Sequence, residues 1–368
     1  MYIVKISTSF SDFPLLRQTP NEKGIWDNVQ FFINDDSIKE PDYWIVYNGL
    51  KKEEKAFCPK DNVILITGEP PTIANYNIKF IKQFNRIITC HRDMQHKNKI
   101  YWQQALPWHI GQRITEFIDF NNCKIEITKN YDQLKNKNIE SKDKTKICSV
   151  ISSNKNFIQG HRDRNQFVEI LKNHFEDKID IYGRGFKEIE DKWDAIAPYK
   201  YHIVIENSSF NDYWTEKLAD AFLAEAYPIY YGAENIDSYF SKNSLTKIDI
   251  HSPEKAIKII EKVIQEDYYN KYKNEIRESK QKILDEYNLF PTIVSKLIVQ
   301  DIDKKHNKSK IILKPEIYFR VSMIKRLIKI ILPAPLYNII KTNLKKLRHK
   351  DNSSNEEGNN KNNNSIQR

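Results

Sequence analysis

The sequence contains few cysteines, and their positions indicate no metal site. Cys58, Cys90, Cys123 and Cys148 form no Cys-x-x-Cys pair and no spacing typical of metal ligands. Reduced thiols, as in a cytosolic protein, are therefore expected rather than a framework of disulfide bonds.

Long apolar runs are absent as well. No window of the sequence holds the ~18 uninterrupted apolar residues that a membrane-spanning helix requires. The first ten residues, MYIVKISTSF, lack the basic segment of a signal peptide and favour a first β-strand. We therefore expect a protein that does not cross a membrane.

Excess charge is absent from most of the chain, although the net charge is +10. Residues 1–300 carry 43 basic and 43 acidic side chains, whereas residues 301–350 carry 14 basic and 3 acidic side chains. A nucleic-acid enzyme normally has its basic surface along the fold itself. The neutral body of this chain therefore argues against a nucleic-acid partner.

Glycine is scarce, with nine in the whole chain. Five lie at or just after the ends of predicted strands: Gly68, Gly160, Gly183, Gly185 and Gly232. Glycine is favoured where φ is positive or where two backbones approach closely. An ordinary turn explains any single one equally well, but together they direct attention to the strand ends.

The first 300 residues alternate short apolar runs with helical patterns, which is typical of parallel α/β folds. We predict helices over residues 165–175 and 215–226, among others. The predicted strands cover residues 2–7, 43–49, 62–69, 86–92, 146–152, 178–185, 201–207, 227–233 and 245–250.

A polar stretch at 129–146 interrupts this pattern and is the expected connection between two domains. Two doubly wound halves joined in this way predict a cleft between two lobes. In such sheets, ligands bind beyond the carboxyl ends of the strands.

The segment 205–236 gathers polar residues where a predicted strand meets a predicted helix. Either Thr215 or Asp212 can cap this helix, and Glu216 and Lys217 then occupy its first turn. The free N–H groups of a helix start favour an anion such as a phosphate. A solvated helix start is the alternative interpretation. The expected buried face of the helix consists of Leu218, Phe222, Leu223 and Ala226.

Residues 199–240 resemble the donor-binding motif of the family 10 glycosyltransferases, the α-1,3/4-fucosyltransferases. The resemblance is clear over about 146–250 and patchy over 60–110. The matching elements are Tyr199-Lys200-Tyr201, Glu206-Asn207-Ser208, Tyr213, Thr215-Glu216-Lys217, Pro228-Ile229 and Gly232.

Two further stretches resemble the same family. Residues 62–71, NVILITGEPP, are similar to its Thr-Gly-Glu segment, which implies that Glu69 is the catalytic base. Residues 161–171, HRDRNQFVEIL, are similar to a helix start that contacts the donor diphosphate, which points to Arg164, with Arg162 close enough to be confused with it.

The resemblance also implies roles for the remaining candidate residues. Lys217 would bind phosphate together with Arg164. The other residues implied to line the donor pocket are Asn207, Tyr213 and Glu216, with Gly183, Ser208 and Trp214 as possible further members.

The resemblance implies a GT-B-like α/β fold, with two Rossmann-like doubly wound domains that face a cleft. We expect an acceptor-binding domain over 1–140 and a donor-binding domain over 141–300. A basic amphipathic tail over 301–350 and a disordered end over 351–368 would follow.

The implied activity is inverting, metal-independent transfer of L-fucose from GDP-fucose to a GlcNAc-, Glc- or Gal-type hydroxyl of a bacterial surface glycan. No cofactor is expected, since the Asp-x-Asp at 301–303 lies outside the paired-domain pattern. Trp214 and Asn211-Asp212 depart from the family pattern beside the sugar site. A transferase for another nucleotide sugar, or a non-catalytic membrane-associated protein that binds nucleotide sugars or glycans, therefore stays an alternative.

Residues 316–350 form two basic amphipathic helical patterns separated by Pro-Ala-Pro at 333–335. Such helices suit adsorption to an anionic membrane surface. We expect a cytoplasmic protein, peripheral on the inner face of the cytoplasmic membrane, with an oligosaccharide or glycolipid as acceptor. Packing of these helices onto the body or onto a partner is the alternative.

Overall fold

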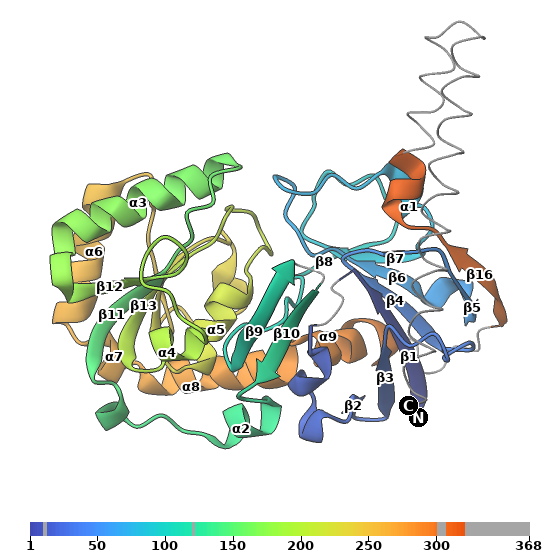
Figure 1. Cartoon of the computed structure of the whole chain (residues 1–368), viewed down its shortest axis with the longest axis horizontal. Coiled ribbons are helices and arrows are strands. Elements are labelled where there is room, and N and C mark those ends of the chain that lie inside the picture. The colour runs from blue at the N-terminus through green and yellow to red at the C-terminus, as the bar shows by residue number, and fades with distance from the viewer. Residues whose placement is uncertain (10–12, 120–121, 300–306, 321–368) are drawn as a thin grey trace, which may run out of the picture. The chain divides into compact units, whose positions relative to one another are not determined.

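Two parallel β-sheets organise the chain, which we describe from a computed structural model over residues 1–9, 13–119, 122–299 and 307–320 (Figure 1). Residues 1–314 form one compact unit, and 315–368 form a second. In the second unit, residues 316–320 are helical.

The first sheet has seven strands in the order β2-β3-β1-β4-β6-β7-β8. All neighbours are parallel except β2 and β3. The central strand β4 is buried at all five positions, as expected for a strand covered on both faces. The strands are β1 (Tyr2–Thr8), β2 (Ile25–Trp26), β3 (Val29–Ile33), β4 (Tyr43–Tyr47), β6 (Val63–Ile66), β7 (Arg86–Thr89) and β8 (Lys99–Tyr101).

The crossovers of the first sheet contain only short helices, which differs from the expected alternation of strands with full helices. The sequence analysis also missed β2, β3 and β8, which are short or partly exposed. The short helices are η1 (Leu15–Gln18), η2 (Pro20–Glu22), η3 (Lys60–Asn62) and α1 (Ile78–Ile81).

The second sheet has five strands, all parallel, in the order β12-β11-β13-β14-β15. Each of them overlaps a predicted strand, and β13 begins two residues earlier than predicted. Helices cover both faces of this sheet (Figure 1). The strands are β11 (Lys146–Ile151), β12 (Ile179–Tyr182), β13 (Tyr199–Ile205), β14 (Tyr227–Tyr231) and β15 (Thr246–Lys247), and the helices between and after them are α3 (Gln159–Phe175), η5 (Glu176–Lys178), α4 (Lys192–Ile196), α5 (Glu216–Leu223), η6 (Ile236–Ser238) and α6 (Pro253–Gln265).

Helix α5 has the predicted apolar face, but it ends earlier than 226. Its four predicted core residues are fully buried. Glu225 adopts φ 48°, and a left-handed residue at this position ends the helix.

The predicted linker at 129–146 is a structured part of the body. It contains α2 (Tyr131–Asn136), whose start is closed by a capping box between Asn130 and Gln133, and η4 (Ser141–Asp143). Lys144 is buried and donates to the carbonyl of Ala224 at 2.6 Å. Before the linker, β9 (Gln112–Asp119) and β10 (Asn122–Ile127) form a hairpin.

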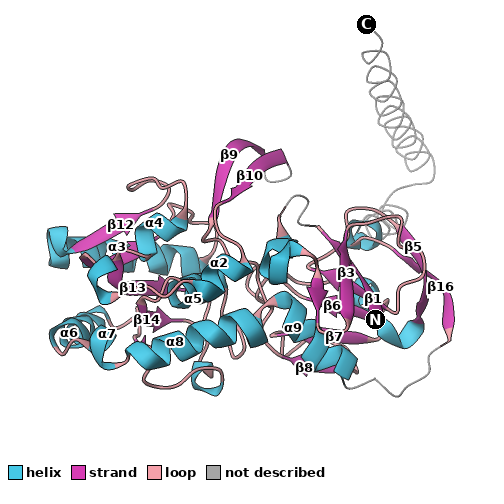
Figure 2. Ribbon diagram, turned by 90° about the horizontal axis from the view of Figure 1, so that it is seen from below, coloured by secondary structure: helices cyan, strands magenta, loops and turns pink. Residues whose placement is uncertain are grey.

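The two hydrophobic cores interleave along the chain, so they do not divide at the predicted boundaries of 140 and 300. Trp108 and Ile110 already pack in the core of the second sheet. A helical stretch leads back from the second sheet to the first (Figure 2), and Leu289, Phe290 and Ile293 pack in the first core. This stretch comprises α7 (Tyr268–Lys271), α8 (Lys273–Lys282), η7 (Ile283–Tyr287), α9 (Leu289–Ile293) and η8 (Val294–Ile298).

The segment predicted as a tail begins with a strand. β16 (Lys308–Leu313) pairs antiparallel with β5 (Glu54–Pro59) and so belongs to the first unit. The predicted amphipathic helices beyond residue 320 and the predicted disordered end at 351–368 lie outside the described residues. Within the described ranges, no helix has the length and apolar content that a membrane span requires.

Candidate active site

The turn from β13 to α5 is organised by a buried carboxylate. Glu206 follows the last residue of β13 and is 0% exposed. It accepts hydrogen bonds from the backbone N–H of Thr215 at 2.8 Å and from the Thr215 hydroxyl at 2.7 Å. Thr215 is the N-cap of α5, and its Oγ1 accepts from the N–H of Lys217 at 3.3 Å. Of the two predicted caps, Thr215 is therefore the one used.

Lys217 is held between two glutamates at this helix start. Its Nζ lies 3.1 Å from Oε2 of Glu206 and 3.4 Å from Oε1 of Glu216. Burial disfavours the ammonium, but the two carboxylates outweigh burial and raise the pKa of Lys217. Burial raises the pKa of Glu206, while Lys217 opposes that shift. Lys217 is therefore a permanent cation in a defined position.

Arg164 reaches the same region from α3. Its guanidinium donates from Nη1 to Oδ1 of Asn207 at 2.6 Å and from Nη2 to Oγ of Ser153 at 3.2 Å. It is 5% exposed, and its buried Nε has no hydrogen-bond partner within the described structure. Burial lowers the pKa of Arg164, and the charge of Glu206 acts in the opposite direction. Sequence reasoning left Arg162 as a competitor, but Arg162 is exposed and bonds to Gln159 and Asn156.

Gly160 allows α3 to approach the end of β13. A Cβ at residue 160 would lie 1.8 Å from the carbonyl oxygen of Asn207. Glycine is therefore required here for close backbone packing. Gly183, at the end of β12, has φ 112°, and a Cβ there would lie 1.9 Å from the carbonyl oxygen of Ser152. Both glycines shape the rim at the carboxyl ends of the second sheet.

Glu69 lies three residues after β6, on the rim of the first sheet. It is half-buried, and its backbone carbonyl is bonded to Nε2 of His91 at 2.7 Å. Burial raises the pKa of Glu69, and the nearby charge of Glu216 raises it further. Lys217 and Lys155 act in the opposite direction. Glu69 therefore shares an electrostatic environment with the start of α5.

Two contacts join the loops of the first sheet to the β13–α5 turn. The hydroxyl oxygens of Thr72 and Ser208 lie 2.7 Å apart. Arg92 forms an ion pair with Asp212, whose other carboxylate oxygen accepts from the Tyr239 hydroxyl at 2.7 Å. The predicted site residue Ser208 thus contacts the loop that follows Glu69.

Tyr213 and Trp214 are buried behind the turn, being 2% and 3% exposed. The Trp214 ring packs against Tyr239, Phe240 and Tyr287, with ring centroids 5.3–5.8 Å apart. Both residues therefore support the wall of the site from the core. The prediction that their side chains line a pocket stays a prediction.

A second layer under Glu216 was missed by the sequence analysis. Nδ1 of His109 lies 3.8 Å and Nζ of Lys192 lies 3.9 Å from Oε1 of Glu216. His109 is half-buried. Burial and the charge of Lys192 lower its pKa, so its imidazole is neutral at physiological pH. The charges of Lys217 and Lys192 hold the pKa of Glu216 well below its usual range although burial opposes this.

Asp220, one turn further along α5, completes this layer. Its Oδ1 accepts from the backbone N–H groups of His109 and Ile110 at 3.0 and 3.2 Å. Burial raises its pKa to about 7, and Lys192 at 3.7 Å opposes the shift. The only available signal was that Asp220 stands on the apolar face of a predicted helix, where a carboxylate needs a partner.

The site combines fixed cations, a helix start and a half-buried carboxylate at the carboxyl ends of two parallel sheets. This set of groups suits a transferase that binds a nucleotide-linked substrate. Comparison with known proteins agrees: residues 140–308 match the family model described as glycosyltransferase family 10 (fucosyltransferase) C-term.

The names of curated relatives also describe a fucosyltransferase. The chain is 33% identical over 131 residues to "4-galactosyl-N-acetylglucosaminide 3-alpha-L-fucosyltransferase 9" of Mus musculus and of Homo sapiens, covering 34% of each chain. The chain therefore spans about a third of the length of the curated relatives that it matches. A solved alpha1,3-fucosyltransferase is similar with a TM-score of 0.46 and 16% identity, over 74% of this chain and 80% of that one.

Proposed function

We propose that the protein is a family 10 glycosyltransferase that moves L-fucose from GDP-fucose to a hydroxyl of a GlcNAc-, Glc- or Gal-type acceptor in a bacterial surface glycan. The match of residues 140–308 to the family model and the names of the curated relatives support this proposal. The observation that carries it is the pairing of two cations, the half-buried Lys217 and the buried Arg164, at one strand-to-helix rim.

These cations would receive the diphosphate of the donor. Arg164 presents several N–H donors in a planar fork, and Lys217 adds a point charge, which together suit two phosphate groups. The start of α5 also places the positive end of its helix dipole at the same rim. Glu216 would accept hydrogen bonds from ribose hydroxyls, since the charges of Lys217 and Lys192 keep it ionised.

Glu69 would act as the base. The acceptor oxygen would form a bond to C1 of fucose while the bond from C1 to the diphosphate oxygen breaks and GDP leaves with the electron pair. The acceptor proton would pass to the Glu69 carboxylate. A single displacement of this kind inverts the anomeric centre, and the cations rather than a metal would stabilise the leaving group.

The C-terminal segment would hold the enzyme at a membrane surface. Residues 301–350 carry an excess of eleven positive charges, and the apolar residues of 316–350 recur at helical spacing, which suits an interfacial helix. We propose that the protein lies on the inner face of the cytoplasmic membrane, where its oligosaccharide or glycolipid acceptor would be built.

Donor hydrolysis by the full-length protein in EDTA tests the reaction. GDP-fucose, GDP-mannose, UDP-galactose and UDP-GlcNAc are supplied separately, and released nucleotide is measured. Selective release of GDP from GDP-fucose is expected. Release of nucleotide from another donor would mean that the enzyme transfers a different sugar. Absence of both nucleotide release and GDP binding would contradict the proposal.

Three variants test the proposed roles, and Glu69→Gln separates an enzyme from a binding protein. Glu69→Gln should lose turnover and still bind GDP, whereas a protein that only binds nucleotide sugars would be unchanged in every assay. Arg164→Ala should weaken GDP binding about 30-fold, the loss of roughly 2 kcal/mol expected for a charged hydrogen bond. Arg162→Ala is the matched control and should bind GDP normally.

A further inference from the structure

Phe157 is the most exposed large apolar side chain among the residues that the structure describes, at 80%. It lies in the loop between β11 and α3, and its ring contacts His161 edge-on with the centroids 6.4 Å apart. Single exposed apolar residues are common on protein surfaces, so exposure alone does not mark a binding site. The construction and position of the loop supply the further evidence.

The loop 153–158 is tied down through its backbone. Three side chains from the first turns of α3 donate to its carbonyl oxygens, which leaves the Phe157 ring pointing outward. These bonds run from Arg164 to Ser153 at 3.3 Å, from Asn165 to Lys155 at 2.8 Å and from Arg162 to Asn156 at 3.1 Å. The N–H of Asn154 also donates to the carbonyl of Arg184 at 3.1 Å. An ordered loop loses little conformational entropy when a ligand binds to it.

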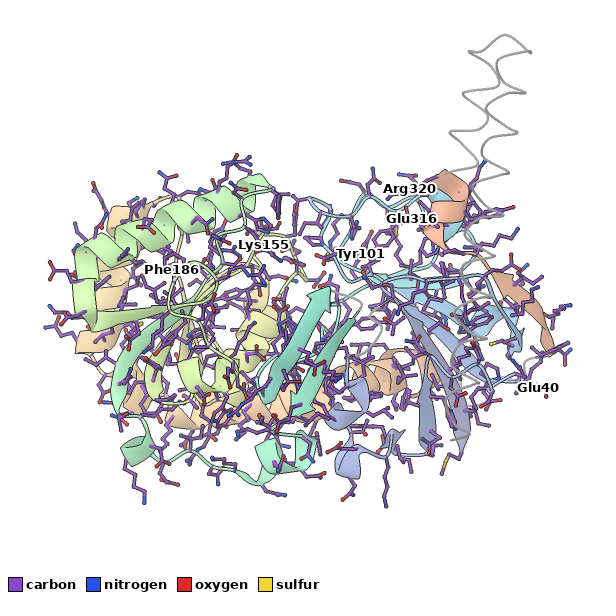
Figure 3. The ribbon with its side chains drawn as sticks, in the orientation of Figure 1. Glu40, Tyr101, Lys155, Phe186, Glu316 and Arg320 are labelled. Atoms are coloured by element: carbon purple, nitrogen blue, oxygen red, sulfur yellow. The ribbon has the colours of Figure 1, made fainter. Side chains whose placement is uncertain are left out.

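This loop lies between the proposed donor site and the proposed catalytic base, Glu69. Arg164 connects it directly to Asn207 at the donor site. On the other side, Lys155 is close enough to Glu69 for its charge to act on that carboxyl. In Figure 3, Lys155 lies before α3 on the side of the second sheet that faces the first sheet. Phe157 follows Lys155 by two residues.

We propose that Phe157 is the floor of an acceptor subsite, on which the apolar face of a pyranose ring stacks so that a hydroxyl of that sugar reaches Glu69. The inference rests on the proposed transferase function and adds the residue that would select the acceptor. The C–H groups on one face of a pyranose are apolar and weakly positive, and the face of a phenyl ring carries negative quadrupole charge. A polar acceptor needs such a platform because its hydroxyl groups form hydrogen bonds with water about as well as with a protein, so these bonds alone add little affinity.

Steady-state kinetics of Phe157→Ala test the subsite. The Michaelis constant for the acceptor should rise at least tenfold, while hydrolysis of GDP-fucose without acceptor and the Kd of GDP stay unchanged. Phe157→Trp should restore the acceptor constant, because it keeps an aromatic face. Ile147→Ala is the matched control: Ile147 is also exposed, at 51%, but lies in β11.

Saturation-transfer NMR gives a readout that does not depend on turnover. N-acetyllactosamine, lactose and GlcNAc are the probes, each added to the protein loaded with GDP. Wild type should transfer saturation to at least one probe, and Phe157→Ala should lose that signal. An unchanged acceptor constant in Phe157→Ala, or no signal from wild type that does hydrolyse the donor, would overturn the subsite. A lower affinity for GDP in Phe157→Ala would also overturn it, since the ring would then contact the nucleotide base.

The two levels of the proposal fail differently. If no donor is hydrolysed and GDP does not bind, the transferase function is wrong. If GDP-fucose is hydrolysed normally and Phe157→Ala has no effect on the acceptor, only the subsite is wrong.

Discussion

Nζ of Lys217 lies 3.1 Å from Oε2 of Glu206, a carboxylate with no exposed surface. The two residues are eleven positions apart and are brought together because Thr215 starts α5 directly against the end of β13. The ion pair fixes the ammonium at the rim of the second sheet. A lysine without this partner would sample many positions, since its side chain has four rotatable bonds.

Replacement of Glu206 by Gln should therefore destabilise the protein and weaken donor binding together. The change leaves the Lys217 ammonium without its buried counter-charge, and removal of one partner of a buried ion pair costs about 3 kcal/mol. Urea unfolding and the Kd of GDP measure the two effects. The exposed pair of Lys247 and Asp237 is the control, and Asp237→Asn should cost less than about 1 kcal/mol. Equal costs at the two sites would contradict a structural role for Glu206.

Glu69 should set the acidic limb of the pH–rate profile. The base must be ionised, and burial with the charge of Glu216 raises its pKa, so kcat should rise with pH through a value above the ordinary range for glutamate. Lys155→Ala removes a charge that lowers this pKa, so the acidic limb should move to higher pH. Glu216→Gln removes a charge that raises it, so the limb should move to lower pH. Shifts in the reverse directions would exclude Glu69 as the titrating group.

Asp220 should make stability depend on pH. Burial raises its pKa to about 7 in the folded protein, whereas the unfolded chain has a carboxyl pKa of about 4. The folded state then binds more protons than the unfolded state between these two values, so the stability contributed by protonated Asp220 is lost as pH rises from about 4 to about 7. The difference in urea midpoint between wild type and Asp220→Asn, measured from pH 5 to 8, isolates this group. A constant difference across that range would contradict the assignment.

Gly160 should not tolerate a side chain. Because its Cβ would meet the Asn207 carbonyl oxygen at 1.8 Å, Gly160→Ala should shift α3 away from β13 at a cost of about 2 kcal/mol. The same shift would move Arg164 and lower the affinity for GDP. Gly49→Ala is the control, since the nearest atom to a Cβ there is 3.7 Å away. Thermal unfolding and GDP titration of both variants decide whether the close approach exists.

The strands of both sheets were largely predictable from the sequence. A strand covered on both faces must be apolar at consecutive positions. Such a run can be recognised from adjacent residues alone, as in Tyr43–Tyr47 and Tyr199–Ile205. The start of α5 was also predictable from neighbouring residues, because Thr215, Glu216 and Lys217 form a local capping pattern. Short or half-exposed strands such as β8 and β16 carry no such pattern and were missed.

The tertiary structure alone decided which distant groups meet. His109 and Lys192 reach Glu216 only because the segment at 108–110 packs into the second core, and the return of 289–298 to the first core has no local signature. Arg164 rather than Arg162 faces Asn207 because side chains two positions apart on a helix point in directions that differ by about 200°. Local patterns depend on neighbours in the chain, whereas these contacts depend on how separate elements pack. The sequence by itself determined the elements and the kind of chemistry at the strand ends, and the packing of those elements decided the charges around that chemistry.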